Sequence, residues 1–204
     1  SSEDLKVNLK FGAIHTPYTQ QVQNSWKLRY INKVFVDVNK IQSTSDLGAT
    51  AKFAMFDDQL TLWTGVFNGK GYKYPENDEY KKTEATIKLK PLSSLKELAL
   101  ISHYSREAKD RDSKKDELIA NSLVYVSKKF NFGGEYIMGE KSGYKFNGFS
   151  GFTYFNAFDK VSPFFRYDSF DKNTDDDDDA ETHLIGGVEY KVNKKFKLAF
   201  DYQE

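Results

Sequence analysis

The amino-acid sequence predicts an all-β fold, an antiparallel up-and-down transmembrane β-barrel with short turns on one side and long loops on the other. Three observations predict it. Apolar and polar residues alternate with the period of a β-strand along most of the 204 residues. The chain is 16% aromatic, with 17 Phe and 13 Tyr, although its mean hydropathy is −0.67. Short turns and long polar loops also follow one another in a regular rhythm, as they do in membrane barrels.

The N-terminal half contains four stretches with this alternation. Asp57-Asp58 is a tight turn between the second and the third stretch, because Asp favours turns. Pro91 ends the fourth, because proline cannot donate to a sheet ladder. We therefore expect strands at residues 5–11, 47–56, 60–67 and 85–90.

The C-terminal half predicts the remaining strands at residues 98–104, 118–128, 130–138, 144–158, 161–169, 182–192 and 195–203. Short turns are expected at Asp57, Lys128 and Asn193, and long loops at 68–81, 106–117 and 171–181. Ten or eleven strands fit, whereas single-chain bacterial barrels use even numbers. Because Glu204 ends the chain without a terminal aromatic residue, we expect residues 1–204 to be a single barrel or part of one.

The polar stretch 19–45 breaks the strand pattern. It contains Trp26 and is expected to be a loop with a short helix that folds into the pore. Lys27, Arg29 and Lys33 would then be candidates for lining a constriction. An ordinary surface loop explains the same residues equally well.

Alternation also assigns the two faces of each strand. The bilayer core disfavours Lys or Arg by about 2–4 kcal/mol at its midplane, so charged residues should face the lumen. The pore-lining candidates are Lys6, Lys10, Lys88, Lys90, Arg166, Asp168, Glu189, Lys191, Lys197 and Asp201. This set is rich in cations, and rings of Lys and Arg favour anions. Unselective diffusion is the alternative, because opposite charges also pair across strands.

Four segments in order are similar to one known family. The first is Phe11 to Tyr18, with a Thr-Pro-aromatic turn before a long insertion, and the second combines 46–49 with 64–69. The third is 85–91, which ends in proline, and the fourth combines 164–171, 186–190 and 197–203. Together they resemble the phosphate-selective porin O/P family over roughly residues 9–204. The resemblance implies a homotrimeric channel with an inward-folded constriction loop and an anion preference. The chain is shorter than a full-size member, so it resembles the C-terminal part of one.

Several classes of function are disfavoured by composition and motifs. The chain has no Cys, and its 30 basic residues balance its 30 acidic ones, so we expect no thiolate site and no nucleic-acid partner. His15, His103 and His183 lack ligand spacing, and no catalytic motif is present, so we expect no enzyme activity and no cofactor.

Five consecutive carboxylates stand at 175–179, within the 171–181 stretch. We expect a solvated, acidic external loop there. Asp175, Asp177 and Asp179 are weak metal candidates, because hard cations bind carboxylate oxygens but the spacing matches no known loop.

These observations together favour a porin of the bacterial outer membrane, a passive channel for small hydrophilic solutes or ions. Its expected surroundings are outer-membrane lipid and lipopolysaccharide. Two alternatives remain open at this point. A soluble all-β carbohydrate-binding module would show the same alternation, and an outer-membrane barrel enzyme would need a catalytic constellation that the sequence does not display.

Overall fold

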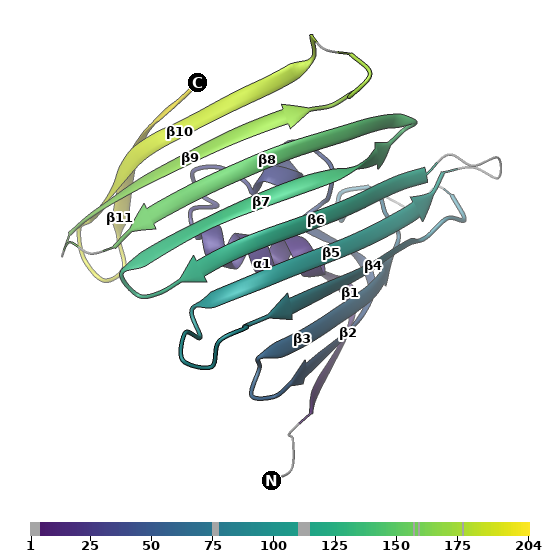
Figure 1. Cartoon of the computed structure of the whole chain (residues 1–204), viewed down its shortest axis with the longest axis horizontal. Helices are drawn as coiled ribbons and strands as arrows, with labels where there is room; N and C mark the ends of the chain where they lie inside the picture. Colours follow the sequence, from purple (N-terminus) through teal and green to yellow (C-terminus); the bar gives the residue numbers. More distant parts are fainter. Residues whose placement is uncertain (1–4, 75–77, 110–114, 157, 159, 177) are drawn as a thin grey trace.

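The computed structural model describes residues 5–74, 78–109, 115–156, 158, 160–176 and 178–204. Eleven strands form one antiparallel sheet in which each strand pairs with its neighbours in sequence, an up-and-down meander (Figure 1). The strands are β1 Lys6–His15, β2 Ser45–Met55, β3 Leu60–Phe67, β4 Lys82–Leu89, β5 Leu98–Ala108, β6 Lys115–Val126, β7 Phe130–Lys141, β8 Tyr144–Phe155, β9 Val161–Asp171, β10 Ala180–Lys191 and β11 Lys197–Gln203. Two helices, α1 Pro17–Trp26 and α2 Phe35–Val38, lie in the connection between β1 and β2.

The predicted all-β antiparallel meander is confirmed, and all eleven expected strands are present. The prediction of a loop over 106–117 is wrong at both ends, because β5 continues to Ala108 and β6 begins at Lys115. Charged side chains at a strand end can reach water, so polarity alone does not mark the end of a ladder. The acidic stretch 171–181 contributes Asp171 to β9 and residues 180–181 to β10, which leaves 172–179 as the connection.

The turn between β7 and β8 consists of Ser142 and Gly143, both with positive φ, at 54° and 89°. Two central residues with positive φ make the type I′ geometry, whose twist matches that of a hairpin. The turn between β2 and β3 instead has three consecutive residues with positive φ, at positions 56–58. Asp tolerates this conformation better than most residues, which suits Asp57 and Asp58 to the turn.

Connections alternate between the two ends of the sheet. One end carries 16–44, 68–81, 109–114, 142–143 and 172–179. The opposite end carries 56–59, 90–97, 127–129, 156–160 and 192–196. The three expected short turns all lie at the second end, and the three expected long loops all lie at the first. The two-residue turn at 142–143 is the exception at the first end.

The first and last strands are the edges of the sheet. Within the described residues, β1 pairs only with β2 and β11 only with β10. Because all ten neighbouring pairs are antiparallel, β1 and β11 run in the same direction. Direct pairing of these two edges would therefore be parallel, whereas one added strand would keep every pair antiparallel.

The convex face of the sheet is apolar on every strand. The register places outward side chains from neighbouring strands beside one another, for example Leu100 beside Leu123 and Tyr136 beside Phe149. Each of the eleven strands exposes at least one large apolar residue on this face: Phe11, Leu47, Val66, Ile87, Leu100, Leu123, Tyr136, Phe149, Phe165, Val188 and Phe200. A continuous exposed apolar band of this kind marks an interaction surface.

The concave face also contains apolar residues, beside the charged residues that were expected to face inward. Ile101, Ile137 and Phe164 point inward and are at most 4% exposed. They form a core with residues of the 16–44 connection, which crosses behind the sheet at α1 in Figure 1. The simple rule of apolar outside and charged inside fails on these strands because another part of the chain covers their inner face.

Candidate functional site

Residues 16–44, called the inner segment below, lie against the concave face of the sheet. Its helix α1 contacts strands β3 to β8. Trp26, at the end of α1, packs edge-on against Phe152 of β8 and Phe164 of β9, with ring centroids 5.5 and 6.4 Å away. Tyr18, Trp26 and Phe35 are all at most 1% exposed. Apolar packing therefore holds the inner segment against the wall of the sheet.

Tyr18 connects α1 to the sheet through a buried polar cluster. Its hydroxyl donates to Glu135 Oε2 at 2.7 Å and lies 2.7 Å from Ser122 Oγ. Because the phenol has a single proton, Ser122 is the donor in the second bond. The ring stacks on His103 with centroids 5.0 Å apart. Burial, and then the negative charge of Glu135, raise the pKa of Tyr18 well above its ordinary value, so the phenol stays protonated and donating.

Three more hydrogen bonds tie the inner segment to strands β4, β9 and β10. Each joins it to a buried charged side chain of the wall, which would be costly to leave unpaired. They run from Gln42 Nε2 to Glu84, from Arg166 Nη1 to the Lys33 carbonyl at 2.5 Å, and from the Tyr30 hydroxyl to Glu189. Burial and the bond to Glu189 raise the pKa of Tyr30.

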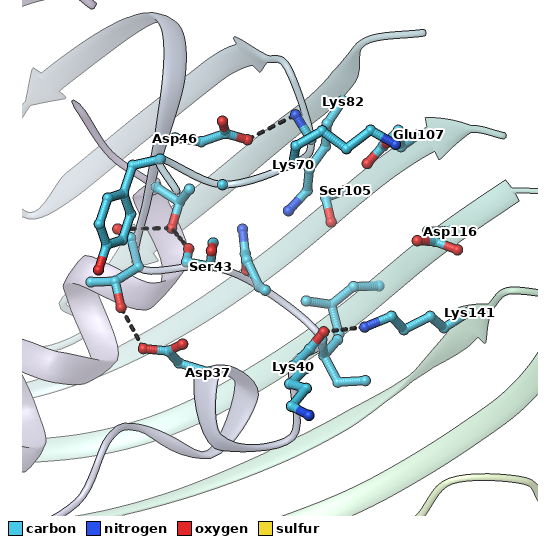
Figure 2. Close-up of a pocket in the computed structure, with 18 of the residues that line it drawn as sticks. Asp37, Lys40, Ser43, Asp46, Lys70, Lys82, Ser105, Glu107, Asp116 and Lys141 are labelled. Atoms are coloured by element: carbon cyan, nitrogen blue, oxygen red, sulfur yellow. Dashed lines mark hydrogen bonds between the residues drawn. The ribbon is translucent and has the colours of Figure 1, made fainter. Parts of the chain in front are cut away.

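A cavity of about 500 Å³ lies where the inner segment meets the 68–81 connection and the concave face of the sheet. Figure 2 shows charged side chains from four parts of the chain around it. Asp46 of β2 accepts from the backbone N–H of Leu47 at 2.7 Å and of Gly69 at 2.8 Å, and so fixes the start of the 68–81 connection. The cavity is formed by segments distant in sequence.

Six carboxylates line this cavity, of which Glu117 and Glu140 belong to the convex face by register. The four that face inward all have local donors. Asp37 accepts from Thr44 and pairs with Lys33 at 3.0 Å, and Asp46 binds the two backbone amides. Glu107 pairs with Lys109, and Asp116 lies 3.3 Å from the same ammonium. Their negative charge is therefore largely compensated within the protein.

Four ammonium groups in the cavity lack such compensation. Within the described residues, Lys40, Lys73 and Lys82 have no carboxylate oxygen at ion-pair distance. Lys141 donates to the carbonyl oxygen of Lys40, which carries no formal charge. The unpaired charge of the cavity is consequently positive, and a positively charged recess attracts anions.

Nine of the ten predicted pore-lining residues lie on the concave side by register, and whether they line a pore stays a prediction. Lys90 lies beyond the end of β4, with its backbone N–H bonded to the carbonyl of Gln59 at 2.8 Å. Three cations of the set are paired: Arg166 with Asp168 at 2.6 Å, Lys197 with Glu189 at 2.7 Å, and Lys6 with Asp58 at 3.6 Å. Lys6, Lys10, Lys191 and Asp201 are exposed near the sheet edges, and Lys88 contacts Gln21 Oε1 at 3.3 Å.

The predicted constriction residues fall into two groups, and their role in a constriction stays a prediction. Lys27 is exposed at the end of α1, with a left-handed φ of 63°. Arg29 and Lys33 line the cavity, and both lie near Asp37. The segment predicted over 19–45 lies inside the curve of the sheet and contains two helices where the sequence suggested one.

His103, Thr86 and Glu84 come together on β4 and β5. His103 Nδ1 lies 2.8 Å from Thr86 Oγ1, and Nε2 lies 3.7 Å from Glu84. This order of hydroxyl, imidazole and carboxylate resembles a nucleophilic triad, which requires an accessible hydroxyl. All three side chains are buried, and Tyr18 stacks on the imidazole, so the arrangement serves packing. The spacing of Thr86 and His103 in the sequence gave no sign of it.

In the acidic loop, Asp177 lies outside the described residues, while Asp175 and Asp179 belong to the 172–179 connection. Across the ranges that the structure describes, no group of three or more His, Cys, Asp or Glu residues has the geometry to hold a metal ion. Asp175 and Asp179 therefore remain without a described metal site.

The cavity residues that sequence reasoning missed include Asp37, Lys40, Asp46, Lys70, Lys82, Glu107, Lys109, Asp116 and Lys141. Most of them stand at strand ends or in connections, where a charged residue normally indicates only contact with water. A usable signal was the number of lysines flanking the connections at 68–81 and 109–114. Which of these face one another depends on strand order and register.

A comparison of the sequence with protein-family models finds no match, and a comparison with curated proteins finds none either. Neither helix in the described part of the chain is long and apolar enough to cross a membrane.

Proposed function

We propose that this chain forms the wall of a β-barrel channel in the bacterial outer membrane, through which small hydrophilic solutes or ions diffuse passively. The observation that carries the proposal is the convex face, where all eleven strands expose large apolar side chains. In water this band would be a severe aggregation hazard, whereas hydrocarbon accommodates it. The alternating connections at the two ends of the meander agree with this placement.

A membrane location adds a requirement for the sheet edges. Hydrocarbon offers no hydrogen-bond partner to a free strand edge, so spanning sheets must close. In the proposed membrane form, the edges of β1 and β11 are joined through further strand pairing. Because these strands run in the same direction, an odd number of additional strands makes every new pair antiparallel.

The inner segment would narrow the lumen, and the cavity would give it a preference for anions. Lys40, Lys82 and Lys141 supply positive charge without carboxylate partners, and exposed cations in a pore favour anions. The four segments similar to the phosphate-selective porin O/P family support kinship with that family and a homotrimeric assembly. These two points rest on that similarity alone.

The two other functions receive less support. A soluble carbohydrate-binding module would need to cover the convex band with a second layer. An outer-membrane barrel enzyme would need an accessible nucleophile, and the Thr86 hydroxyl is sealed beneath Tyr18 and His103.

The test is single-channel recording in planar bilayers, with a salt gradient to measure the permeability ratio of anion to cation. We expect discrete channel openings. The reversal potential in the salt gradient should show that anions are more permeant than cations. Replacing Lys82 and Lys141 together by Gln should lower the ratio while channels still form. Lys128→Gln, in the turn at the opposite end of the sheet, is the matched control and should leave the ratio unchanged. Folded protein that produces no channels would refute the proposal.

A further inference from the structure

Arg29 and Lys33, two cations that line the cavity, both form ion pairs with the carboxylate of Asp37. Lys33 Nζ lies 3.0 Å from Asp37 Oδ1, and Arg29 Nη2 lies 3.9 Å from Asp37 Oδ2. The Lys33 side chain is 51% exposed and the Arg29 side chain is 37% exposed, whereas the Asp37 side chain is only 10% exposed. A ligand in the cavity can therefore reach the cations more easily than it can reach the acid.

Asp37 is held in place by contacts that do not involve the two cations. Thr44 Oγ1 donates to its Oδ2 at 2.5 Å, and its backbone N–H bonds to the Val34 carbonyl at 2.9 Å. The backbone of Lys33 is fixed as well, because Arg166 of the wall donates to its carbonyl oxygen. The carboxylate is thus a fixed counter-ion, while the Lys33 side chain remains free to change partner.

We infer that Asp37 sets the strength of the anion site in the cavity, because its carboxylate competes with a passing anion for the guanidinium of Arg29 and the ammonium of Lys33. The inference rests on the proposed channel function and adds a residue that controls its selectivity. Conduction requires binding strong enough for entry and weak enough for exit. Because Asp37 competes for the two cations, they can attract a passing anion without binding it so tightly that it fails to leave.

The other carboxylates that face the cavity are engaged by other partners, so Asp37 is the acid that acts on Arg29 and Lys33. From the neighbouring elements, Lys40 and Lys141 add positive charge, while Asp116 is engaged by Lys109. Glu107 is engaged by the same lysine, and Asp46 by backbone amides. Among the described residues lining the cavity, Asp37 is the carboxylate that pairs with both Arg29 and Lys33.

The experiment measures chloride-to-potassium permeability and the salt dependence of conductance for Asp37→Asn. Asn keeps the shape and an oxygen acceptor for Thr44. Removing one charge about 6 Å from a passing ion in water changes the local ion concentration about threefold, so we expect the ratio to rise about three- to tenfold. Conductance should also saturate at lower salt, because the anion leaves more slowly. Asp37→Glu should behave like the wild type. Glu97→Gln is the matched control, because Glu97 is exposed in the 90–97 connection at the other end of the sheet.

A second substitution separates competition from a general charge effect. In the Lys33→Gln background, Asp37→Asn should raise the ratio less than it does in the wild type, because one of the two cations that it frees is gone, whereas a general charge effect would give the same rise in both backgrounds. Lys33→Gln alone leaves Asp37 less compensated and should shift the ratio toward cations about threefold, which tests the inference even if Asp37→Asn fails to fold. Channels whose ratio and saturation do not respond to these changes would overturn the role of Asp37 and leave the channel proposal standing. A silent wild type would overturn both.

Discussion

Replacing Phe149 with Arg tests whether the convex face meets hydrocarbon. Phe149 lies at the middle of β8, is 46% exposed on the convex face, and is paired with Tyr136 and Ser169. Neither neighbour can neutralise a guanidinium. At the midplane of a bilayer an Arg on the lipid face costs about 2–4 kcal/mol, so we expect the free energy of unfolding to fall by that amount.

The free-energy cost of an Arg on the lipid face falls from the middle of the bilayer to its surface, so the same substitution near a strand end is a matched control. Phe196 is 52% exposed but lies in the 192–196 connection, beyond the strand ends. There the same substitution should cost about 0–1 kcal/mol. A difference of 2–3 kcal/mol between the two variants corresponds to roughly a 30- to 150-fold change in the unfolding constant. Phe149→Leu keeps an apolar side chain and shows how much of the effect is loss of the ring.

The assay is reversible urea unfolding of protein inserted into short-chain phosphatidylcholine vesicles. Trp26 and Trp63 report the transition by fluorescence, because both are nearly fully buried. If Phe149→Arg destabilises the protein no more than Phe196→Arg does, the middle of the convex face lies in water and the reasoning is refuted.

Two further substitutions test how the inner segment is held. Trp26→Ala removes the ring packed between Phe152 and Phe164 and should lower the free energy of unfolding by about 3–5 kcal/mol. The channel conductance should rise, because the inner segment is held less firmly. Unchanged stability and conductance would contradict the packing described. Tyr18→Phe deprives the buried Glu135 of a donor and should cost about 1–3 kcal/mol, whereas Tyr190→Phe on the convex face should cost little. Because the folded state raises the pKa of Tyr18 while the unfolded phenol ionises near pH ~10, stability should fall as pH rises above about 10. Tyr18→Phe should reduce that slope in alkaline unfolding curves, and an equal slope would show that this phenol ionises freely.

Much of the sheet was predictable because alternation is a local property. Residues 60–67 were expected as a strand and form β3 with those bounds. The turn at Ser142-Gly143 was not foreseen, although a polar residue before glycine suits a type I′ turn. The charged ends of β5 and β6 were taken for loop, because a sequence does not show which charges continue a ladder.

The interior was less predictable, because it depends on contacts between distant segments. Leu98 to Ile101 is apolar at every position, so alternation could not tell which face is covered. Ile101 is buried because the inner segment lies above it. The pairing of Asp37 with Arg29 and Lys33 follows from a short local fold, whereas the approach of Lys82 and Lys141 requires the full register from β4 to β7.

The most direct test of a hydrocarbon-facing convex surface is a spin-label scan along β5, which needs no background mutations because the chain contains no cysteine. Labels at outward Leu100 and Tyr104 should collide readily with oxygen and little with a water-soluble nickel chelate. A label at Leu92, exposed in the 90–97 connection, should show the reverse. Nickel accessibility at positions 100 and 104 equal to that at position 92 would place the apolar face in water and contradict the account.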